Sequence, residues 1–376
     1  MTNDWHRFPT NLSARPVTRN RTVTPVVLDM DTGVDDAVAL VLALISEELD
    51  VRAITSVAGN APVDACTRNN VLISELIDEH CAPPVARGAE APLLRPLVIA
   101  PEVHGEDGLG GLWHSLPDPH STARIDEPAH EVIARISREA LSNRRRVEIG
   151  TAGENGGDEP VPRAGDGPVL IATGPLTNLG LALREDPHAL DGYERIVIMG
   201  GAFDAPGNTG PVAEFNFYVD PDAADLVMGS GRPITLVPLD VTTTTVLPSS
   251  MLALYAADRV FPRPGLCLGR ILHRALDYYI AFQKWESGLP GGYMHDPLAV
   301  ATVLHPEYFE TTDATVRVLT DGPDRGRSVA CSPEPGRTAQ VVSSVDAPLF
   351  ISMLEDRVLI PVFISKDYSG RCTGHI

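Results

Sequence analysis

Four aspartates crowd a short segment near the beginning of the chain. Asp29, Asp31, Asp35 and Asp36 lie within eight residues, just ahead of the apolar helix pattern of Val38–Ile45. Like charges this close repel one another. A hard cation resolves the conflict, because Ca²⁺ takes roughly six to eight oxygen ligands and favours carboxylates. Capping the following helix would need only one of these side chains. The spacing therefore predicts a metal site at a strand-to-helix turn.

The same segment could support a different chemistry. Phosphatases that form an aspartyl-phosphate also begin with a strand ending in Asp-x-Asp, which would make Asp29 the nucleophile and Asp31 the acid. Those enzymes carry Thr or Val two residues after the second aspartate, whereas this chain has Gly33, and they have no use for the Asp35-Asp36 pair. The metal site is therefore the favoured interpretation. In it, Gly33 is expected to permit a tight turn, and the pair suits the positive end of the following helix.

Composition narrows the class of protein. The 376 residues are 43% hydrophobic and 21% charged, as is typical of globular proteins. The formal net charge of −20 argues against a nucleic-acid duplex or an anionic membrane as partner, and no apolar run approaches the roughly 18 residues that span a bilayer. The five cysteines are scattered without zinc-ligand spacing, which predicts reduced thiols in a cytoplasmic protein. Residues 1–24 are polar, lack a signal-peptide pattern and are expected to form a flexible extension.

Apolar strand patterns alternate with helical ones, which predicts an α/β fold with an open, mainly parallel sheet flanked by helices. Strands are expected at Val26–Asp29, Val51–Val57, Val169–Ala172, Arg195–Met199 and Ile234–Pro238, with edge or antiparallel strands at Thr315–Leu319 and Gln340–Ser343. Helices are expected at Val63–Ile77, Glu131–Leu141, Leu176–Leu183, Pro221–Val227, Leu266–Lys284 and Pro297–Leu304. No linker separates two cores, so residues 25–376 are predicted to form a single catalytic domain. Within it, residues 142–167 lack an apolar face and are expected to form a mobile surface loop.

Polar residues follow the predicted strands in unusual density. They include Asn60 after the second strand, Thr173–Asn178 after the third, Glu214–Asn216, Asp240–Thr242 and the His295-Asp296 pair. In open parallel sheets, ligands bind at the carboxyl ends of the strands. We therefore expect an active site at that edge of the sheet.

Taken in order, these segments resemble the nucleoside hydrolases, specifically the inosine-uridine-preferring type. The matching motifs are Asp29-x-Asp31-x-Gly33-x-Asp35-Asp36-Ala37, Ala58-Gly59-Asn60, His104-Gly105-x-Asp107-Gly108-Leu109-Gly110, Thr173-Gly174-Pro175-Leu176-Thr177-Asn178, Met199-Gly200-Gly201, Gly207-Asn208, Ala213-Glu214-Phe215-Asn216, Asp220-Pro221-x-Ala223-Ala224 and His295-Asp296-Pro297-Leu298-Ala299-Val300. Each motif alone is weak, but together they cover the chain from about Val26 to its end. The resemblance implies a nucleoside hydrolase fold and Ca²⁺-dependent hydrolysis of the N-glycosidic bond of ribonucleosides to free base and ribose. Many relatives have Pro where this chain has Thr32, a departure that removes no metal ligand.

The resemblance also assigns a metal site and a base. Asp31, Asp36, Asp296 and the backbone carbonyl of Thr173 are implied to hold Ca²⁺, and all of them are oxygen donors, as a hard cation requires. Asp31 is further implied to take the proton from the attacking water, which the metal helps to acidify.

The sugar and the nucleobase have their own implied partners. The residues implied to bind the ribose hydroxyls are Asp35, Asn60, Asn208, Glu214 and Asn216; acids and amides suit a diol, which offers both donors and acceptors.

His295 is implied to meet the base, either as an acid that protonates it or as a simple hydrogen-bonding contact. On the preceding helix, Gln283 could pair with a pyrimidine edge while Tyr279, one turn away on the same face, stacks on the ring. For the neighbouring aromatic residues Tyr278, Phe282 and Trp285, a place in the core or in a subunit contact is an equal alternative. His104 is expected to hold a loop near the site.

Two other functions stay open at the level of sequence. The same site could cleave another N-riboside, such as nicotinamide riboside or a modified nucleoside. A non-catalytic Ca²⁺- or ribose-binding protein is the third possibility, and the acid or amide at every matched position argues against it. Preference for purine or pyrimidine is not determined. The resemblance implies a homodimer or homotetramer that acts in nucleoside salvage or catabolism.

Overall fold

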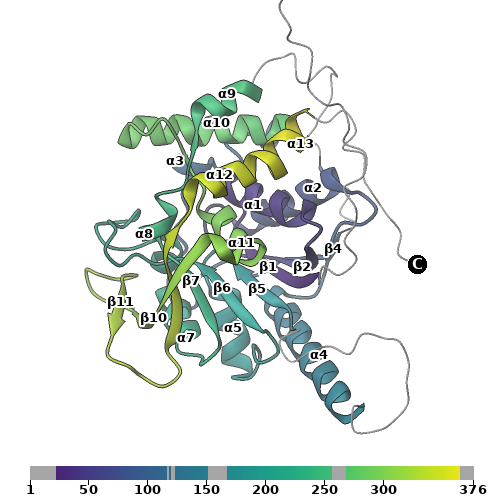
Figure 1. Ribbon diagram of the computed structural model, residues 1–376, viewed down its shortest axis with the longest axis vertical. Helices are drawn as coiled ribbons and strands as arrows, with labels where there is room; N and C mark the ends of the chain where they lie inside the picture. Colours follow the sequence, from purple (N-terminus) through teal and green to yellow (C-terminus); the bar gives the residue numbers. More distant parts are fainter. Residues whose placement is uncertain (1–22, 117, 120–122, 151–166, 256–267, 365–376) are drawn as a thin grey trace, which may run out of the picture.

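A ten-stranded sheet organises the chain (Figure 1). The computed structural model describes residues 23–116, 118–119, 123–150, 167–255 and 268–364. The strand order is β11-β10-β12-β7-β6-β5-β1-β2-β3-β4. Within this sheet, neighbouring strands pair in parallel except where β10 meets β11 and β12. The predicted open, mainly parallel sheet is confirmed, including its antiparallel addition near one edge.

The strands of the sheet are β1 Thr24–Met30, β2 Leu49–Ser56, β3 Val85–Ala86, β4 Arg124–Ile125, β5 Val169–Ala172, β6 Arg195–Met199, β7 Ile234–Val237, β10 Phe309–Val318, β11 Ser328–Cys331 and β12 Thr338–Val345. A separate two-stranded ribbon is formed by β8 Val246–Pro248 and β9 Gly291–Tyr293. The α-helices are α1 Val34–Ile45, α2 Val63–Ile77, α3 Pro101–His104, α4 Ala129–Gly150, α5 Thr177–Glu185, α6 Phe215–Val219, α7 Pro221–Met228, α8 Leu239–Thr242, α9 Ser249–Tyr255, α10 Leu268–Ser287, α11 His295–Leu304, α12 Ala347–Leu354 and α13 Ile360–Ile364. None of the helices in the described ranges has both the length and the apolar character to cross a membrane.

Alternating side chains of β1 divide the core into two layers. Val26, Leu28 and Met30 belong to a cluster that includes the buried faces of α1, α10 and α11. Val27 points the other way, into a cluster with α4, α5 and α7. Helices therefore cover both faces of the sheet, as Figure 1 shows. The nearly continuous burial of α1 follows, because it packs between the sheet and other helices.

The strand order reverses beside β1. From β1 the chain builds outward through β2, β3 and β4, whereas β5, β6 and β7 extend the sheet in the opposite direction. The connections that leave β1 and β5 therefore diverge, and open α/β sheets bind ligands at such a switch point, at the carboxyl ends of the strands. Asp31 follows β1 and Thr173 follows β5. The topology thus brings two of the predicted site segments together.

The prediction of a loop at 142–167 is wrong for residues 142–150, which continue helix α4. The segment from Ser142 to Ile149 contains no glycine or proline to stop a helix. The Ser142 hydroxyl donates to the Arg138 carbonyl at 2.9 Å, and Arg144 docks the helix by donating to the Gly192 carbonyl at 3.0 Å. Residues 151–166 lie outside the described residues. So do residues 1–22 of the expected N-terminal extension, whereas Thr24 already belongs to β1.

Candidate active site

Carboxylates from three segments converge at the carboxyl end of β1. Asp31 follows this strand, Asp35 and Asp36 occupy the first turn of α1, and Asp296 is the second residue of α11. All four are buried, with at most 4% of the residue exposed. Oxygen atoms of Asp35, Asp36 and Asp296 lie within 4.8 Å of one another. We call these four residues the aspartate cluster.

The aspartate cluster carries negative charge without a compensating cation. No lysine or arginine of the described ranges pairs with it. Burial, followed by the charge of Asp36, raises the pKa of Asp31 well above its ordinary value and that of Asp35 to about 7. Burial and the neighbouring carboxylates raise the pKa of Asp296 in the same way. Buried carboxylates at this spacing are costly alone, so the cluster fits a hard divalent cation.

Asn60 ties Asp31 to Asp36. Its backbone N–H donates to Oδ2 of Asp31 at 2.7 Å, and its side-chain amide donates to Oδ2 of Asp36 at 3.0 Å. The other oxygen of Asp31, Oδ1, is buried and has no hydrogen-bond partner among the described residues. A buried acceptor without a partner is costly, so this oxygen is the one placed to receive a cation or a water.

Glycines let the backbone approach the aspartate cluster. A Cβ at Gly59 would lie 2.1 Å from Oδ2 of Asp31, and one at Gly174 would lie 2.9 Å from Oδ1. Gly33 was expected to allow a tight turn, but its φ of −88° is open to any residue. The physical reason for glycine here is space, because a Cβ would lie 2.5 Å from Nδ1 of His104.

Thr173 connects the aspartate cluster to Asn216. Its hydroxyl donates to Oδ1 of Asp36 at 2.7 Å. Its carbonyl, the predicted metal ligand, accepts the side-chain amide of Asn216 at 2.7 Å. Asn216 also donates to the Met199 carbonyl at 3.2 Å. The nitrogen of this predicted ribose contact is therefore committed to the protein, and its amide oxygen is the atom left for a ligand.

Glu214 is the N-cap residue of α6. Its carboxylate accepts the backbone N–H groups of Asn216 at 2.7 Å and of Phe217 and Gly201 at 3.1 Å. Burial raises the pKa of Glu214 to about 7, against the opposing effect of these three donors. Asn208, the remaining predicted ribose contact, lies exposed on the loop between β6 and α6. The structure thus brings Glu214 and Asn216 beside Thr173 and leaves Asn208 at the surface.

His295 begins α11, next to Asp296. Its Nδ1 lies 2.7 Å from the hydroxyl of Thr242, and its ring packs 5.3 Å from that of Tyr293, centroid to centroid. Burial lowers the pKa of His295 to about 4. The neutral imidazole is therefore the prevailing form of this side chain near neutral pH.

Helix α10 and His104 close the same side of the site. Tyr279 and Gln283 are both buried on one face of α10, as predicted, and they hydrogen-bond to each other. The ring of His104 stacks on Tyr279 with centroids 5.9 Å apart. Nδ1 of His104 accepts the backbone N–H of Val34 at 3.1 Å, which holds the first turn of α1. His104 therefore has the expected structural role near the site.

Asp29, grouped with the other aspartates by spacing, does not join the aspartate cluster. Its Oδ1 accepts the Thr55 hydroxyl at 2.6 Å and the Asn178 amide at 2.7 Å. Burial, opposed by these two donors, raises the pKa of Asp29 to about 6. The side chain thus braces β1 against β2 and α5. Its other oxygen, Oδ2, is buried and has no hydrogen-bond partner among the described residues.

Two supporting residues on α8, Asp240 and Thr242, were assigned no role from the sequence. The Asp240 carboxylate accepts the backbone N–H groups of Phe203, Asp204 and Ala205 at 2.7–2.9 Å, anchoring the loop that carries Asn208. Thr242 contacts His295. Their position after β7 was the available signal. No residue type or spacing in the sequence identifies their partners.

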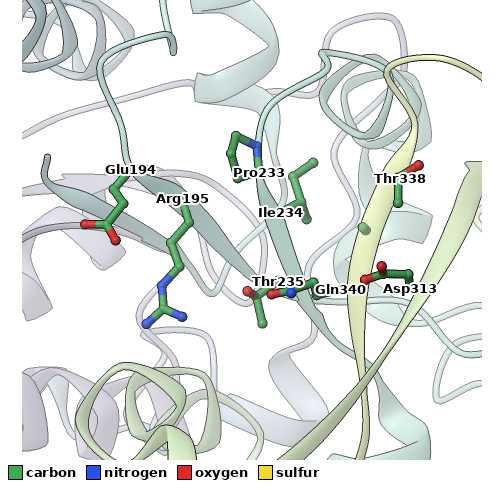
Figure 2. A pocket seen from close by; sticks show the side chains of 9 residues that line it. Glu194, Arg195, Pro233, Ile234, Thr235, Asp313, Thr338 and Gln340 are labelled. Atoms are coloured by element: carbon green, nitrogen blue, oxygen red, sulfur yellow. The ribbon is translucent and has the colours of Figure 1, made fainter. Parts of the chain in front are cut away.

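A cavity of about 350 Å³ elsewhere in the molecule is separate from this site (Figure 2). Its lining includes Arg195, Ile234 and Thr338, which are the first residues of β6, β7 and β12. The cavity therefore lies at the amino ends of parallel strands. The aspartate cluster lies at their carboxyl ends, so the two belong to opposite edges of the sheet.

Comparison with known proteins identifies relatives over most of the chain. The family described as inosine-uridine preferring nucleoside hydrolase matches residues 26–352. The pyrimidine-specific ribonucleoside hydrolase RihA of Salmonella gallinarum is 38% identical over 342 residues, covering 89% of this chain and 98% of the relative. RihA of Escherichia coli O1:K1 is also 38% identical, over 341 residues with the same coverage.

Solved structures of nucleoside hydrolases have a similar fold. A purine-preferring ribonucleoside hydrolase from Gardnerella vaginalis superposes with a TM-score of 0.75 at 30% identity, covering 89% of this chain and 98% of the other. An inosine-guanosine nucleoside hydrolase gives a TM-score of 0.71 at 25% identity, covering 91% and 100%.

The close approach at Gly59 gives a first prediction. Gly59→Ala should push the Asp31 carboxylate from its place and weaken binding of a divalent cation by about 10–100-fold, as is typical when support around a metal site is lost. Calorimetric titration of the variant with CaCl₂ measures the change. Gly229→Ala is the matched control, because its Cβ would meet, at 2.9 Å, the flexible guanidinium of Arg337. Equal affinity in Gly59→Ala and the wild type would contradict the packing described above.

Proposed function

The chain belongs to the inosine-uridine preferring nucleoside hydrolase family and is a ribonucleoside hydrolase, and from this premise we propose which of its residues carry the reaction. Hydrolysis breaks the bond between the base nitrogen and C1′ of ribose while water adds to C1′, through an oxocarbenium-like transition state. The protein must activate water, stabilise positive charge on the sugar and assist the leaving base. The convergence of buried carboxylates at the β1–β5 switch point is the observation that carries this assignment.

The proposed metal is Ca²⁺. The carboxylates of Asp31, Asp36 and Asp296 would hold it together with the Thr173 carbonyl, a donor set made only of oxygen. When bound, the ion would offset the charge of the cluster and lower the pKa of an attached water. A carboxylate oxygen of Asp35 lies within 4.8 Å of oxygens of Asp36 and Asp296. Asp35 is therefore close enough to contact a sugar hydroxyl beside the ion.

Asp31 is the proposed general base. Oδ2 is held by the Asn60 N–H at 2.7 Å, which fixes the orientation of the carboxylate. Oδ1 is buried and has no partner among the described residues. That oxygen is therefore free to accept the proton of the attacking water without breaking an existing hydrogen bond.

Ribose is proposed to bind between the aspartate cluster and the Glu214–Asn216 segment. Asp35, Asn60, Asn208, Glu214 and Asn216 are the proposed contacts to its hydroxyls. In the structure Asn60 and Asn216 share their side-chain nitrogens with protein acceptors, so their amide oxygens would accept from the sugar. Asn208 would reach the sugar only if its exposed loop turned inward.

The base is proposed to lie against His295 and Gln283. Both belong to the same wall of the site as Tyr279. The charges of Asp35 and Asp296 help to raise the pKa of Tyr279, which hydrogen-bonds to Gln283. A pyrimidine is the proposed preference, supported by the name of the RihA relatives at 38% identity. Gln283 can pair with the edge of such a ring, because an amide both donates and accepts.

We also infer a cytoplasmic homo-oligomer that acts in ribonucleoside salvage or catabolism. Large apolar side chains such as Trp285, 82% exposed, and Leu254, 71% exposed, lie on α10 and α9 and would be covered by a second copy. Cys66 and Cys81 are free thiols, which suits a reducing compartment.

The identity of the metal can be tested directly. Enzyme stripped with a chelator should lose its turnover of ribonucleosides, and Ca²⁺ should restore it, because the carboxylates of the aspartate cluster would otherwise repel one another. Anomalous scattering from a calcium-soaked crystal should place one ion among Asp31, Asp36 and Asp296. Full activity in the stripped enzyme, or a calcium peak elsewhere only, would refute the proposed site.

Asp31→Asn tests the general base. The variant should fold normally but lose turnover by at least about 10²–10⁴-fold, because it weakens the metal site and removes the proton acceptor together. Circular dichroism checks the fold, and steady-state kinetics on uridine measures the loss. Asp126→Asn, at an exposed position, serves as the matched control. A near wild-type rate for Asp31→Asn would show that another group activates the water.

Substrate selectivity tests the sugar and base pockets. Uridine should exceed 2′-deoxyuridine in kcat/KM by roughly 10⁴-fold, because loss of the 2′-hydroxyl leaves buried polar partners unpaired. Uridine should also exceed inosine if the pyrimidine proposal is correct. Competition between labelled substrates gives these ratios in one vessel. Similar values for uridine and 2′-deoxyuridine would mean that these residues do not form the ribose pocket.

A further inference from the structure

The hydroxyl of Thr242 is directed at the imidazole of His295. Its Oγ1 lies 2.7 Å from Nδ1 of that ring, and Thr242 is fully buried. The two residues are 53 positions apart in the chain, so the contact is made by the tertiary fold. Because Nδ1 is engaged, Nε2 is the ring atom left for a substrate.

The other threonines of the same run use their hydroxyls differently. Thr243 donates to the Leu239 carbonyl at 2.7 Å, Thr244 to the Val241 carbonyl at 2.6 Å, and Thr245 to the Thr242 carbonyl at 2.8 Å. Such local bonds to the helix backbone are the usual habit of threonine. The hydroxyl of Thr242 instead contacts a side chain. Among the described residues, Nδ1 of His295 is the acceptor within reach of its hydroxyl.

The donor and the acceptor of the Thr242–His295 contact follow from the surroundings of the hydroxyl. A buried hydroxyl proton needs an acceptor, and no backbone carbonyl takes that of Thr242 in the described part of the chain. The hydroxyl therefore donates to Nδ1, which must be the unprotonated nitrogen of the ring. In a neutral imidazole the proton then resides on Nε2.

Both partners are rigidly held. The Thr242 N–H donates to the Pro238 carbonyl at 3.1 Å, and the Leu239 N–H donates to the Gly201 carbonyl at 2.9 Å, which anchors α8 to the end of β6. On the other side, the β8–β9 ribbon is extended by the bond from the Met294 N–H to the Thr245 carbonyl at 3.0 Å. The ribbon therefore sets His295 beside Thr242.

We propose that Thr242 is the positioning residue for His295, whose Nε2–H it orients as a hydrogen-bond donor toward the leaving base. This inference deepens the proposed function and rests on it, because it takes His295 as the group that meets the base. Nucleobases present acceptors, namely carbonyl oxygens and unprotonated ring nitrogens, and negative charge develops on them as the glycosidic bond breaks. A donor fixed in place before the reaction stabilises that charge without reorganisation.

The test compares substrates that differ in their need for this donor. Uridine releases uracil, a poor leaving group, whereas 4-nitrophenyl riboside releases the 4-nitrophenolate anion, which is stable without assistance. Thr242→Val, which keeps the shape but removes the hydroxyl, should lower kcat/KM for uridine by about 10–100-fold, a part of the usual effect of a positioned proton donor. Its activity on 4-nitrophenyl riboside should stay within about threefold of the wild type, since the rest of the site is intact.

Two matched variants control for folding. Thr242→Ser keeps the hydroxyl and should restore uridine hydrolysis to within about fivefold of the wild type, because the same donor remains. Thr243→Val makes the identical chemical change one residue away and removes only a bond to backbone. It should leave the ratio of the two substrates unchanged. Equal losses on both substrates in Thr242→Val, or no loss on uridine, would overturn the inference.

His295→Ala separates this inference from the proposed function. Selective loss on uridine in His295→Ala but not in Thr242→Val would refute the role of Thr242 and leave that of His295 standing. Absence of selective loss in His295→Ala would refute both. Nitrogen-15 shifts of the His295 ring, assigned by comparison with His295→Ala, provide a readout besides activity. They should show an unprotonated Nδ1 in the wild type, and a protonated Nδ1 would overturn the inference.

Discussion

Mutual repulsion among buried carboxylates is the constraint on which the rest of this structure depends. Asp31, Asp35, Asp36 and Asp296 are buried, and neutral donors such as Asn60 and Thr173 meet only part of their hydrogen-bonding need. Neutral hydrogen bonds cannot cancel four negative charges at close spacing. Burial and mutual repulsion raise the pKa values of these carboxyl groups, and a bound cation would offset the same charge.

The fold supplies the rigidity that holds such charges together. Parallel strands end at one edge, and the reversal of strand order beside β1 opens that edge where Asp31 and Thr173 emerge. Beneath them, Asp29 takes hydrogen bonds from Thr55 and Asn178 and locks β1 to its neighbours. Close contacts between glycine backbone and the Asp31 carboxylate leave it little freedom to move apart from its neighbours.

The proposed sugar side and the proposed base side of the site are both contacted by helix α8. Helix α8 is a single turn, yet Asp240 holds the backbone of the loop beyond β6 and Thr242 holds His295. Both contacts come from residues that never need to touch the substrate. Helix α8 thus contacts both proposed binding walls, whose positions matter because misplacement by about 1 Å can cost a large factor in rate.

The amino-acid sequence by itself determined the fold class and the family, and it predicted a set of carboxylates that the structure brings together in the aspartate cluster. Alternation of apolar patterns and the order of short motifs are local properties, readable without knowing which segments touch. It also predicted the shared face of Tyr279 and Gln283, because that follows from helical period alone. Only the tertiary structure decided that Asp29 turns away from the cluster, that Gly33 is needed for space, and that residues 142–150 continue α4. It also decided that the Thr242 hydroxyl contacts Nδ1 of His295. Each of these depends on which atom another segment places nearby, and a single sequence carries no record of that distance.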